Sequence, residues 1–454
     1  MSLQKSFNIQ TFGCAMNEHD SETLAGMLSA LGYTENKEKN KADVAIINTC
    51  SVRDNADKRF YGILGELKKI KESNSNFTVC LCGCMMQQQH IIDTVKRKYP
   101  WVDIIFGTHN IHEFPKLLTS VLSEKQKLVE VWDEAGEIIE GLPAKRDYNF
   151  KAFVNIIYGC DNFCTYCIVP FTRGRERSRM SADIMKEVKE LVSDGVKEIT
   201  LLGQNVNSYN GDVDFAGLIH LLNTIEGLER IRFMTSHPKD LSDRLIQTFA
   251  ECEKLCNYIH LPVQSGSTNV LARMNRKYTR ENYVKLIDRL RAANPEISIT
   301  TDIIVGFPGE TDKDFEDTLD LVKKIEFDSA FTFLYSIRKG TPAEMYKDQI
   351  PEEVKHQRFN RLVDLLNEIS LKKNKALEGC IVKVLVEGAS KKNEEFLTGR
   401  TEGFKTINFN GSKELIGSIV DVEVIKGKTF NLDGKYMLNE KANATDEKYG
   451  DRLK

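Results

Sequence analysis

The sequence predicts an α/β protein in three successive parts: a parallel sheet, a partial barrel of six βα units, and a small all-β barrel. Strand-like and helix-like segments alternate through residues 7–125 and again through 153–336, a pattern typical of parallel strands joined by crossover helices. After residue 379 the pattern changes to short β-type runs separated by glycines, which favours an antiparallel barrel. A chain of 454 residues also exceeds one ordinary domain.

The composition is that of a soluble globular protein, with 41% hydrophobic and 28% charged residues. The first twelve residues hold no long apolar run, and no stretch approaches the ~20 apolar residues of a membrane span. We therefore expect a cytoplasmic protein with no membrane partner. Eleven cysteines in a compartment where disulfides are rare indicate metal or redox use. The net charge of −3 neither favours nor excludes a nucleic-acid partner.

The first part reads as βαβ units on a Rossmann-like parallel sheet. We expect its strands at 7–12, 44–48, 77–82 and 102–106, and its helices at 21–31, 55–71, 87–98 and 111–122. In such a sheet the functional crevice lies beyond the carboxyl ends of the strands.

Three cysteines follow those carboxyl ends: Cys14, Cys50 and Cys84. They should converge along one rim of the sheet, as a metal cluster with three protein ligands requires. The alternative is three core residues, since cysteine is often buried. Cys80 and Cys82 share a strand face with Cys84 by alternation, so spacing leaves the third ligand ambiguous. We prefer Cys84 because it lies past the strand end.

A polar stretch over 126–150 marks the first domain boundary. We assign residues 1–130 to an N-terminal domain, 147–378 to a central domain, 379–442 to the small barrel, and 443–454 to a polar tail.

The central domain supplies six βα units, which suit an open barrel better than a closed eightfold one. We expect strands at 153–158, 198–202, 230–235, 258–262, 298–305 and 330–336, and helices at 182–194, 215–225, 242–252, 280–293 and 313–325. As in barrels generally, the active site should lie at the carboxyl ends of the strands.

A Cys-x3-Cys-x2-Cys run, formed by Cys160, Cys164 and Cys167, follows the first of these strands. Soft thiolates at such short spacing are typical iron–sulfur ligands. Three thiolates leave one iron of a four-iron cluster open, and an open coordination site indicates chemistry rather than a structural role. The alternative, three chance cysteines in a loop, leaves the spacing unexplained. The next loop, Arg173–Arg179, is basic and is either a solvated surface or a contact for phosphate.

The last part reads as a small barrel of the kind that binds RNA through an exposed sheet face. Its strands are expected at 381–386, 395–400, 406–409 and 419–425. Candidate phosphate contacts are Lys391, Lys392, Arg400, Lys405, Lys413, Lys426 and Lys428, and Phe404 or Phe409 would offer a stacking surface. An ordinary capping domain is the alternative.

Four motifs coincide in this chain: Asn48-Thr-Cys-Ser-Val-Arg53, Gly83-Cys-Met-Met-Gln-Gln88, the cysteine run within Gly159–Pro170, and Arg173-Gly-Arg-Glu-Arg-Ser-Arg179. Together they resemble the radical S-adenosylmethionine (SAM) methylthiotransferases over about residues 6–440. The softer motifs around Cys50 and Val169–Glu176 look closest to the bacterial members that modify tRNA. The C-terminal part resembles the TRAM domain that these enzymes carry.

The resemblance implies two 4Fe-4S clusters and SAM as cofactors. Cys160, Cys164 and Cys167 would hold the cluster that cleaves SAM, and Cys14, Cys50 and Cys84 an auxiliary cluster that carries sulfur. We also expect Tyr166, Gln204, Gly306 and Pro308 to contact SAM. A bystander role for Tyr166 and a plain turn for Gly306–Glu310 are the alternatives.

By the same resemblance, the activity would be methylthiolation of carbon 2 of N6-dimethylallyladenosine at position 37 of tRNA, using two SAM molecules. The partners would be the anticodon stem-loop, an electron donor such as flavodoxin or ferredoxin, and a sulfur donor. Alternatives are methylthiolation of N6-threonylcarbamoyladenosine or of an aspartate in a ribosomal protein, and a non-catalytic iron–sulfur protein that binds RNA. Both clusters should face one cavity.

Overall fold

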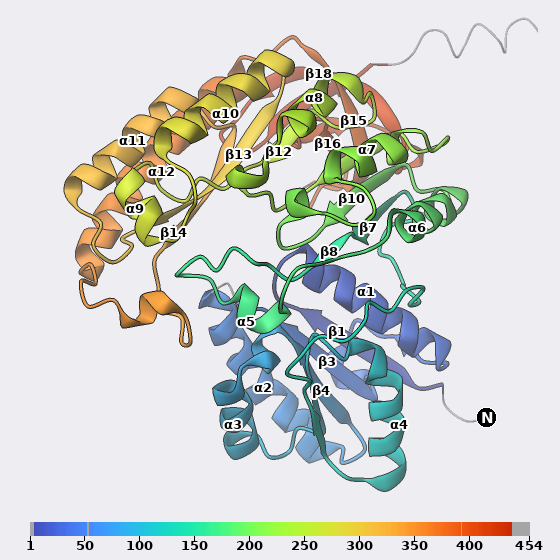
Figure 1. Ribbon diagram of the computed structural model, residues 1–454. Helices are drawn as coiled ribbons and strands as arrows, with labels where there is room; N and C mark the ends of the chain where they lie inside the picture. The colour runs from blue at the N-terminus through green and yellow to red at the C-terminus, as the bar shows by residue number, and fades with distance from the viewer. Residues whose placement is uncertain (1–3, 52–53, 392, 438–454) are drawn as a thin grey trace, which may run out of the picture.

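The computed structural model describes residues 4–51, 54–391 and 393–437 (Figure 1). Val52 and Arg53 of the first motif, Lys392, and the expected tail 443–454 lie outside the described residues. The N-terminal part, blue in Figure 1, lies below the central part, and the C-terminal barrel lies behind the upper part of the central one.

The N-terminal part is a six-stranded parallel sheet in the order β2-β1-β3-β4-β5-β6. Its strands are β1 (Ser6–Thr11), β2 (Thr34–Glu35), β3 (Val44–Thr49), β4 (Thr78–Gly83), β5 (Ile104–Phe106) and β6 (Leu128–Glu130). Every residue of β3 and β4 is buried, as expected for central strands covered on both faces.

Helices cover both faces of this sheet. On one face lie α1 (Ala15–Ala30) and α4 (Phe114–Glu124), and on the other lie α2 (Asp54–Ser73) and α3 (Gln89–Lys98). Short 3-10 turns, η1 (Lys39–Lys41), η2 (Cys84–Gln87) and η3 (Ile111–Glu113), complete this part. Each face contributes its own apolar cluster, so the layered architecture follows from the two-sided burial of the strands.

The central part contains six parallel strands in two ladders, β7-β10-β11 and β12-β13-β14. The strands are β7 (Lys151–Asn155), β10 (Glu198–Leu202), β11 (Arg230–Phe233), β12 (Tyr258–His260), β13 (Ser298–Val305) and β14 (Ser329–Leu334). A single bridge between Ile231 and Leu255 carries the sheet across the gap between the two ladders. The result is the open six-unit barrel that the sequence predicts.

Helices pack outside this barrel, and one apolar core joins them to the strands. They are α6 (Ser181–Ser193), α7 (Phe215–Asn223), α8 (Asp243–Glu251), α9 (Thr268–Arg273), α10 (Arg280–Ala293), α11 (Asp312–Ile325) and α12 (Glu352–Lys375). Before α6, a small hairpin of β8 (Ile157–Tyr158) and β9 (Arg177–Ser178) encloses α5 (Val169–Arg173), and the 3-10 turns are η4 (Val206–Ser208), η5 (Pro238–Asp240) and η6 (Pro342–Met345). In Figure 1, α5 lies against the top of the N-terminal part.

The C-terminal part is a closed five-stranded barrel in the order β15-β16-β17-β19-β18. Its elements are β15 (Ile381–Ala389), β16 (Phe396–Thr401), β17 (Thr406–Asn410), η7 (Lys413–Leu415), β18 (Ile419–Gly427) and β19 (Leu432–Tyr436). The fold class is therefore confirmed in all three parts. The fifth strand, β19, is missing from the sequence prediction because Leu432-Asp-Gly-Lys-Tyr436 has only two apolar residues.

Two further elements differ from expectation. Helix α1 begins at Ala15, six residues before the expected start. Its first turns carry Asn17, Asp20 and Ser21, which are polar yet buried, so an apolar period could not reveal them. Strand β6 lies within the stretch expected to be linker and pairs with β5.

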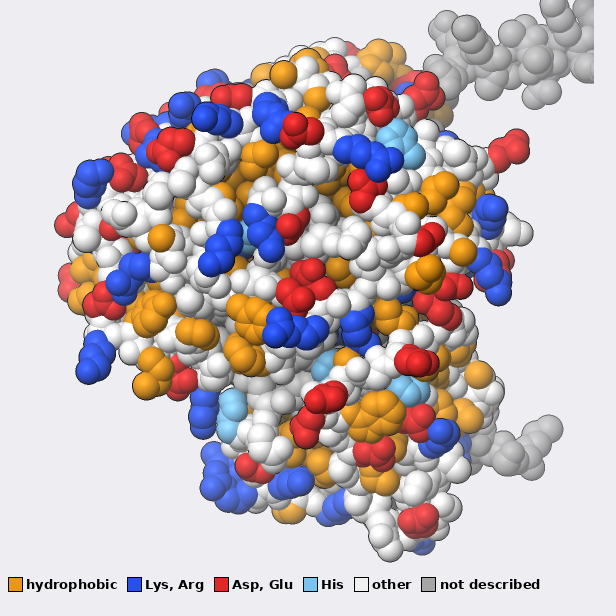
Figure 2. Space-filling model, in the orientation of Figure 1, with side chains coloured by type: hydrophobic (Ala, Val, Ile, Leu, Met, Phe, Trp, Pro, Cys, Tyr) orange, Lys and Arg blue, Asp and Glu red, His pale blue; other side chains and the backbone are white. Residues whose placement is uncertain are grey.

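Among the residues that the structure describes, no helix is long and apolar enough to cross a membrane. Figure 2 shows basic and acidic side chains interspersed over the face drawn, with hydrophobic side chains between them. That face therefore carries no broad area of one charge.

Candidate active site

The first cysteine set lies at the carboxyl ends of three neighbouring strands. Cys50 and Cys84 directly follow β3 and β4, and Cys14 lies three residues past β1. The register pairs Thr11 with Asn48 and Thr49 with Gly83, so the three chain ends lie side by side. The sheet topology therefore brings Cys14, Cys50 and Cys84 to one rim, as predicted.

Gly83 lets the backbone turn sharply before Cys84. Its φ is +91°, and a Cβ there would lie 2.3 Å from the carbonyl oxygen of Thr49. Only glycine fits a backbone approach of this kind. Cys80 and Cys82 lie inside β4, 0% and 1% exposed, and burial raises the pKa of both thiols well above its usual value.

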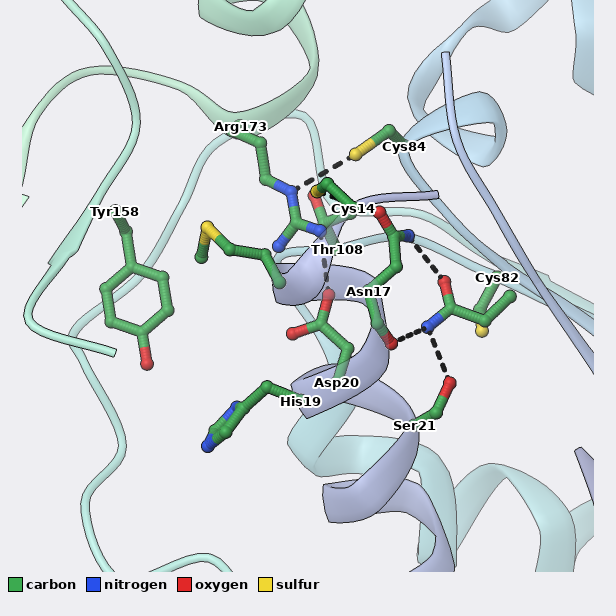
Figure 3. Close-up of polar contacts among 12 residues, drawn as sticks. Cys14, Asn17, His19, Asp20, Ser21, Cys82, Cys84, Thr108, Tyr158 and Arg173 are labelled. Atoms are coloured by element: carbon green, nitrogen blue, oxygen red, sulfur yellow. Dashed lines mark hydrogen bonds and ion pairs between the residues drawn. The ribbon is translucent and has the colours of Figure 1, made fainter. Parts of the chain in front are cut away.

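Amide side chains support the rim beneath Cys14 (Figure 3). Asn48 Nδ2 donates to the carbonyl oxygen of Asn17 (2.9 Å) and to Ser21 Oγ (3.0 Å), and Asn17 Nδ2 donates back to Asn48 Oδ1 (2.9 Å). Cys14 Sγ lies 3.4 Å from Asn17 Oδ1. This closed network fixes the start of α1 against β3 and so fixes Cys14.

The second set, Cys160, Cys164 and Cys167, lies in the loop between β8 and α5. Gly159 opens this loop with φ +78°, and a Cβ there would lie 2.0 Å from the carbonyl oxygen of Arg175. The N–H of Cys167 donates to the carbonyl oxygen of Cys164 (2.9 Å). The loop is thus a tight turn that groups three sulfurs.

N–H donors point at the sulfurs of this second set. Asn162 Nδ2 donates to Cys160 Sγ (3.4 Å), and Arg276 Nη1 donates to Cys164 Sγ (3.5 Å). Burial is the main cause that raises the pKa of Cys160 to about 11 and that of Cys167 to about 12. A metal that binds the thiols of Cys160 and Cys167 must therefore displace protons.

Arg173, the last residue of α5, joins the two sets (Figure 3). Its Nε donates to Cys84 Sγ (3.2 Å) and its Nη2 to Asp20 Oδ2 (2.7 Å). The side chains of Arg173 and Asp20 are 6% and 11% exposed. Beside this pair, Thr108 Oγ1 donates to the carbonyl oxygen of Thr172 (2.8 Å). The loop after the second set is therefore docked on the first.

Each set fits a four-iron cluster by the chemistry of its donors: three cysteine sulfurs, with N–H groups aimed at Cys84 in the first set and at Cys160 and Cys164 in the second. Within the described ranges, no three His, Cys, Asp or Glu side chains gather around a single metal ion. A four-iron cluster is wider than one ion and holds its three sulfur ligands further apart. The two observations are therefore compatible.

One cavity of about 790 Å³ lies between the N-terminal and central parts. Gly13 and Ser51, the neighbours of Cys14 and Cys50, line it from below, and Cys167 lines it from above. The wall also includes residues of β13 and β14, the segment that follows β14, and the side chains of Glu18 in α1, Arg59 in α2 and Phe359 in α12. Cys167 of the second set and the neighbours of two cysteines of the first set thus line one cavity, and the expectation that both clusters face it stays a prediction.

The residues expected to contact SAM lie in different surroundings. Tyr166 lines the cavity. Gln204 Oε1 accepts from the N–H of Gly159 (2.5 Å), and its Nε2 contacts Met16 Sδ. Gly306 packs on the stem of Lys355, and the carbonyl oxygen of Pro308 accepts from Arg273 Nε (3.1 Å). Tyr166 and Gln204 thus border the cysteine loop or the cavity, whereas Gly306 and Pro308 belong to a turn against α9 and α12.

Two residues of the basic loop are neither solvated nor free for phosphate, contrary to both interpretations of that loop. Arg173 and Arg179 are 5% and 7% exposed. Arg179 pairs with Glu140 (2.5 Å) of the linker and with Glu187 (2.7 Å) of α6. These arginines hold the N-terminal part, the linker and the central part together.

The barrel also corrects three expected RNA contacts. Phe409 is fully buried in the barrel core, and the ring of Phe404 packs on Tyr258, 4.8 Å between centroids. Lys405 pairs with Asp328 of the central part (2.9 Å). An exposed aromatic that the sequence reading overlooked is Phe430, 82% exposed.

Arg276 is a site residue that no sequence pattern indicated. It stands in Met274-Asn-Arg-Lys277, outside every motif, yet its buried guanidinium donates to Cys164 Sγ, Tyr278 Oη (2.8 Å) and the carbonyl oxygen of Pro262 (2.8 Å). Only tertiary structure brings it to the cysteine loop.

Comparison with known proteins places this site in a family. A Clostridium botulinum (strain Loch Maree / Type A3) protein named tRNA-2-methylthio-N(6)-dimethylallyladenosine synthase is 56% identical over 433 residues, covering 94% of this chain and 96% of the relative. The chain belongs to this synthase family. Synthases of the same name from Clostridium tetani and Alkaliphilus oremlandii are 56% and 54% identical, over 95% of this chain and 96% and 92% of theirs.

Family models divide this chain into the same three parts as its fold. The Uncharacterized protein family UPF0004 matches residues 6–107, the Radical SAM superfamily residues 154–322, and the TRAM domain residues 375–437. The family therefore makes this chain a radical SAM tRNA methylthiotransferase that uses SAM and 4Fe-4S clusters. Which cysteines hold which cluster stays a prediction.

Solved structures share the fold of this chain. The radical SAM methyltransferase TsrM from Kitasatospora setae, with cobalamin and a 4Fe-4S cluster bound, gives a TM-score of 0.55 at 13% identity, over 75% of this chain and 77% of that one. The cobalamin-dependent enzyme OxsB, with aqua-cobalamin and SAM bound, gives 0.51 at 14% identity, over 80% and 56%.

Proposed function

We propose that this protein methylthiolates carbon 2 of N6-dimethylallyladenosine at position 37 of tRNA. The observation that carries the proposal is the shared cavity: it is lined by Cys167 of one set and by Gly13 and Ser51 beside two cysteines of the other. One nucleotide in this cavity would reach both sets. Two clusters that act on one atom need this arrangement.

We assign Cys160, Cys164 and Cys167 to the SAM-binding cluster, and Cys14, Cys50 and Cys84 to the auxiliary one. When bound, these cofactors supply radical hydrogen abstraction and the sulfur group, because carbon 2 of adenine is neither acidic nor a good electrophile. The chain itself binds and orients the nucleotide and excludes water. Tyr166, between two ligands and on the cavity wall, would pack on the adenine of SAM.

The cavity wall suits a base with an apolar substituent. Ile304, Phe333 and Leu334 form an apolar stretch, with Asp302, Gln264 and Arg338 as polar neighbours. Phe333 is 38% exposed, so a ligand that covers its ring gains hydrophobic free energy. A dimethylallyl group is a branched five-carbon chain and fits this apolar stretch, whereas the carboxylate of N6-threonylcarbamoyladenosine would be desolvated against it unless it paired with a basic side chain of the same cavity, Arg59 or Arg338.

To reach the cavity, the base must leave the stack of the anticodon loop, as single-stranded targets of RNA-modifying enzymes do. The volume of about 790 Å³ lies in the range of small-molecule sites, roughly 300–1,000 Å³. The TRAM barrel would hold the rest of the tRNA through phosphate contacts, which makes the affinity salt-dependent. The electron donor, flavodoxin or ferredoxin, the sulfur donor and the cytoplasmic location belong to the same proposal.

Mass spectrometry of tRNA nucleosides tests the proposal. A strain that lacks the gene should accumulate N6-dimethylallyladenosine and lose its 2-methylthio derivative, and the wild-type gene should restore it. Loss of 2-methylthio-N6-threonylcarbamoyladenosine instead, or unmethylthiolated ribosomal protein, would assign the enzyme to another substrate. Absence of 5′-deoxyadenosine when purified protein receives SAM and reductant would favour a non-catalytic RNA-binding protein.

A further inference from the structure

Arg173 belongs to one half of the molecule by sequence and to the other by contact. It ends α5, six residues after Cys167, yet its guanidinium is buried at the rim of the N-terminal sheet. Nε donates to Cys84 Sγ at 3.2 Å and Nη2 to Asp20 Oδ2 at 2.7 Å (Figure 3). A buried ion pair carries a large desolvation penalty, so its mere presence does not indicate stabilisation.

We infer that Arg173 is a positioning residue that holds Cys84 and sets the reduction potential of the auxiliary cluster from the loop of the SAM-binding one. The inference rests on the proposed function, because it requires Cys84 to be a cluster ligand. N–H donors and positive charge near a ligand sulfur stabilise the reduced, more negative cluster and so raise its potential.

Asp20 provides a second test, because removing its charge should shift the reduction potential in the opposite direction. Its carboxylate pairs with Arg173 and lies in the same buried network. The carboxylate partly cancels the field that the guanidinium exerts at Cys84. Removing the charge of Asp20 should therefore raise the potential, whereas removing that of Arg173 should lower it. Loss of packing alone predicts no such opposition.

Arg276 provides the matched control. Like Arg173 it is buried, and like Arg173 it donates to one cysteine sulfur, but that sulfur belongs to Cys164 of the other set (3.5 Å). Its remaining donors bond Tyr278 and Pro262. A change of Arg276 should leave the auxiliary cluster unaffected.

The test uses full-length protein in which Cys160, Cys164 and Cys167 are replaced by alanine, so that only the auxiliary cluster, with about four irons, remains. The midpoint potential is read from an electron paramagnetic resonance titration of anaerobically reconstituted protein. We expect R173Q to lower it, R173K to lower it less, D20N to raise it, and R276Q to leave it unchanged. R173K keeps the charge but offers one nitrogen where arginine uses two.

Unchanged potentials in iron-loaded R173Q and R173K would overturn the inference, as would shifts of the same sign in R173Q and D20N. If R173Q fails to hold iron, the potentials of R173K and D20N decide whether the inference stands. Cys84→Ala tests separately whether Cys84 is a ligand of the auxiliary cluster, which the inference requires, and Cys82→Ala is its control. Retention of about four irons in C84A overturns the ligand assignment, whereas loss of iron in C84A with unchanged potentials in the arginine variants overturns the role of Arg173 alone.

Discussion

A glycine precedes a cysteine of each set, and in both places a side chain would collide with backbone. Gly83 and Gly159 have φ of +91° and +78°, and a Cβ would lie 2.3 Å and 2.0 Å from a carbonyl oxygen. A carbonyl of the backbone cannot rotate away as a flexible side chain can. These glycines therefore fix the direction in which the following cysteine leaves the chain.

Gly159→Ala should disrupt the second set and spare the first. The methyl group would push Cys160 away from its place, so reconstituted protein should fall from about eight irons to about four. Iron analysis and detection of 5′-deoxyadenosine measure the loss. Gly62→Ala is the control, because Gly62 lies in α2 with nothing within 4 Å of its Cβ position. Eight irons in G159A would show that the turn tolerates a side chain.

Phe333→Ala should reduce the preference for the dimethylallyl group. The ring forms part of the apolar cavity wall, and losing it removes roughly 1–3 kcal/mol of contact with an apolar substituent. The ratio of the affinities for anticodon stem-loop RNA with and without the dimethylallyl group should then fall by about tenfold. Phe430→Ala, which removes a far more exposed ring of the TRAM barrel (82%), should preserve the ratio of the affinities for RNA with and without the dimethylallyl group. An unchanged affinity ratio in F333A would show that the dimethylallyl group binds elsewhere.

Among the site residues, those whose positions depend on neighbouring residues could be predicted from spacing in the sequence. The Cys-x3-Cys-x2-Cys run and the strand-end positions of Cys14, Cys50 and Cys84 could be predicted because neighbouring residues define both patterns. Arg276 and Arg173 act on sulfurs 112 and 89 residues away. No local pattern encodes such a contact, and for Arg173 the surrounding charge run pointed to solvent instead.

Among the elements, the turn Gly306–Glu310 is held by its own carboxylate. Glu310 Oε2 accepts from the N–H groups of Gly306 (2.5 Å) and Phe307 (3.2 Å), and Oε1 faces Arg358 Nη1 (3.3 Å). Burial raises the pKa of Glu310 from 4.5 to about 7, although Arg358 opposes the shift. Ionised Glu310 is thus the less favoured form of the folded turn below neutral pH.

Glu310→Gln should therefore change the pH dependence of stability. Because the folded pKa lies above the unfolded value, the stability that protonated Glu310 contributes is full below pH 4.5 and is lost as pH rises through 7. The free energy of unfolding of E310Q relative to that of the wild type should increase by up to roughly 3 kcal/mol between pH 5 and pH 8. The melting temperature of E310Q relative to the wild type should rise over the same range. Arg358 keeps Asp312 as a partner (2.7 Å). Glu316→Gln, on the exposed face of α11, is the control; equal differences at both pH values would contradict the expectation.

Elements with a clear apolar period were predicted, and elements defined by tertiary contact were not. The strands β10 and β13 match their expected ranges because they are mostly buried runs rich in β-branched residues. The helix α10 matches because it buries Tyr283, Ile287 and Leu290 at helical spacing. Helix α5 spans only five residues, Val169–Arg173, too few for a period. The polar first turns of α1 bond to Asn48 of β3 and to Arg173 of α5 instead of facing solvent, which reverses the usual meaning of a polar face.

For the whole molecule, two buried arginines attach the TRAM barrel to the central part. Arg232 donates to the carbonyl oxygens of Thr401 and Glu402, both at 2.7 Å, and Arg230 to those of Arg400 (3.1 Å) and Lys383 (3.0 Å). Deleting the barrel would leave both guanidinium groups without these acceptors. Such a deletion therefore tests stability together with tRNA binding.

Arg232→Ala should loosen the barrel without removing it. The substitution leaves Glu198, paired with Arg232 at 3.0 Å, with Arg230 at 3.7 Å as its remaining buried partner. The cost therefore stays below the roughly 3–5 kcal/mol of a fully unpaired buried charge. We expect a lower melting temperature and release of a C-terminal fragment under limited proteolysis. Lys428→Ala, which breaks a half-exposed pair with Asp433 inside the barrel, is the control. Wild-type resistance in R232A would show that apolar contacts suffice to hold the barrel.

The three-part order of the chain was predictable, but the docking of the parts was not. The sequence indicated that each cysteine set lies at a strand end, and chemistry required a common cavity. The contacts that create the cavity come from residues read as solvated, such as Arg179 with Glu140 of the linker (2.5 Å). Interfaces between domains resemble polar surfaces in sequence.

The bond between Arg173 and Asp20 spans 153 positions of the chain and crosses the linker. Recombination between related genes that exchanged the N-terminal part alone would carry Asp20 and Cys84 away from the arginine that evolved beside them. A hybrid would fold each half and still misplace one sulfur. Exchange of genetic material should therefore succeed only where the recipient's loop already carries a guanidinium of the same reach.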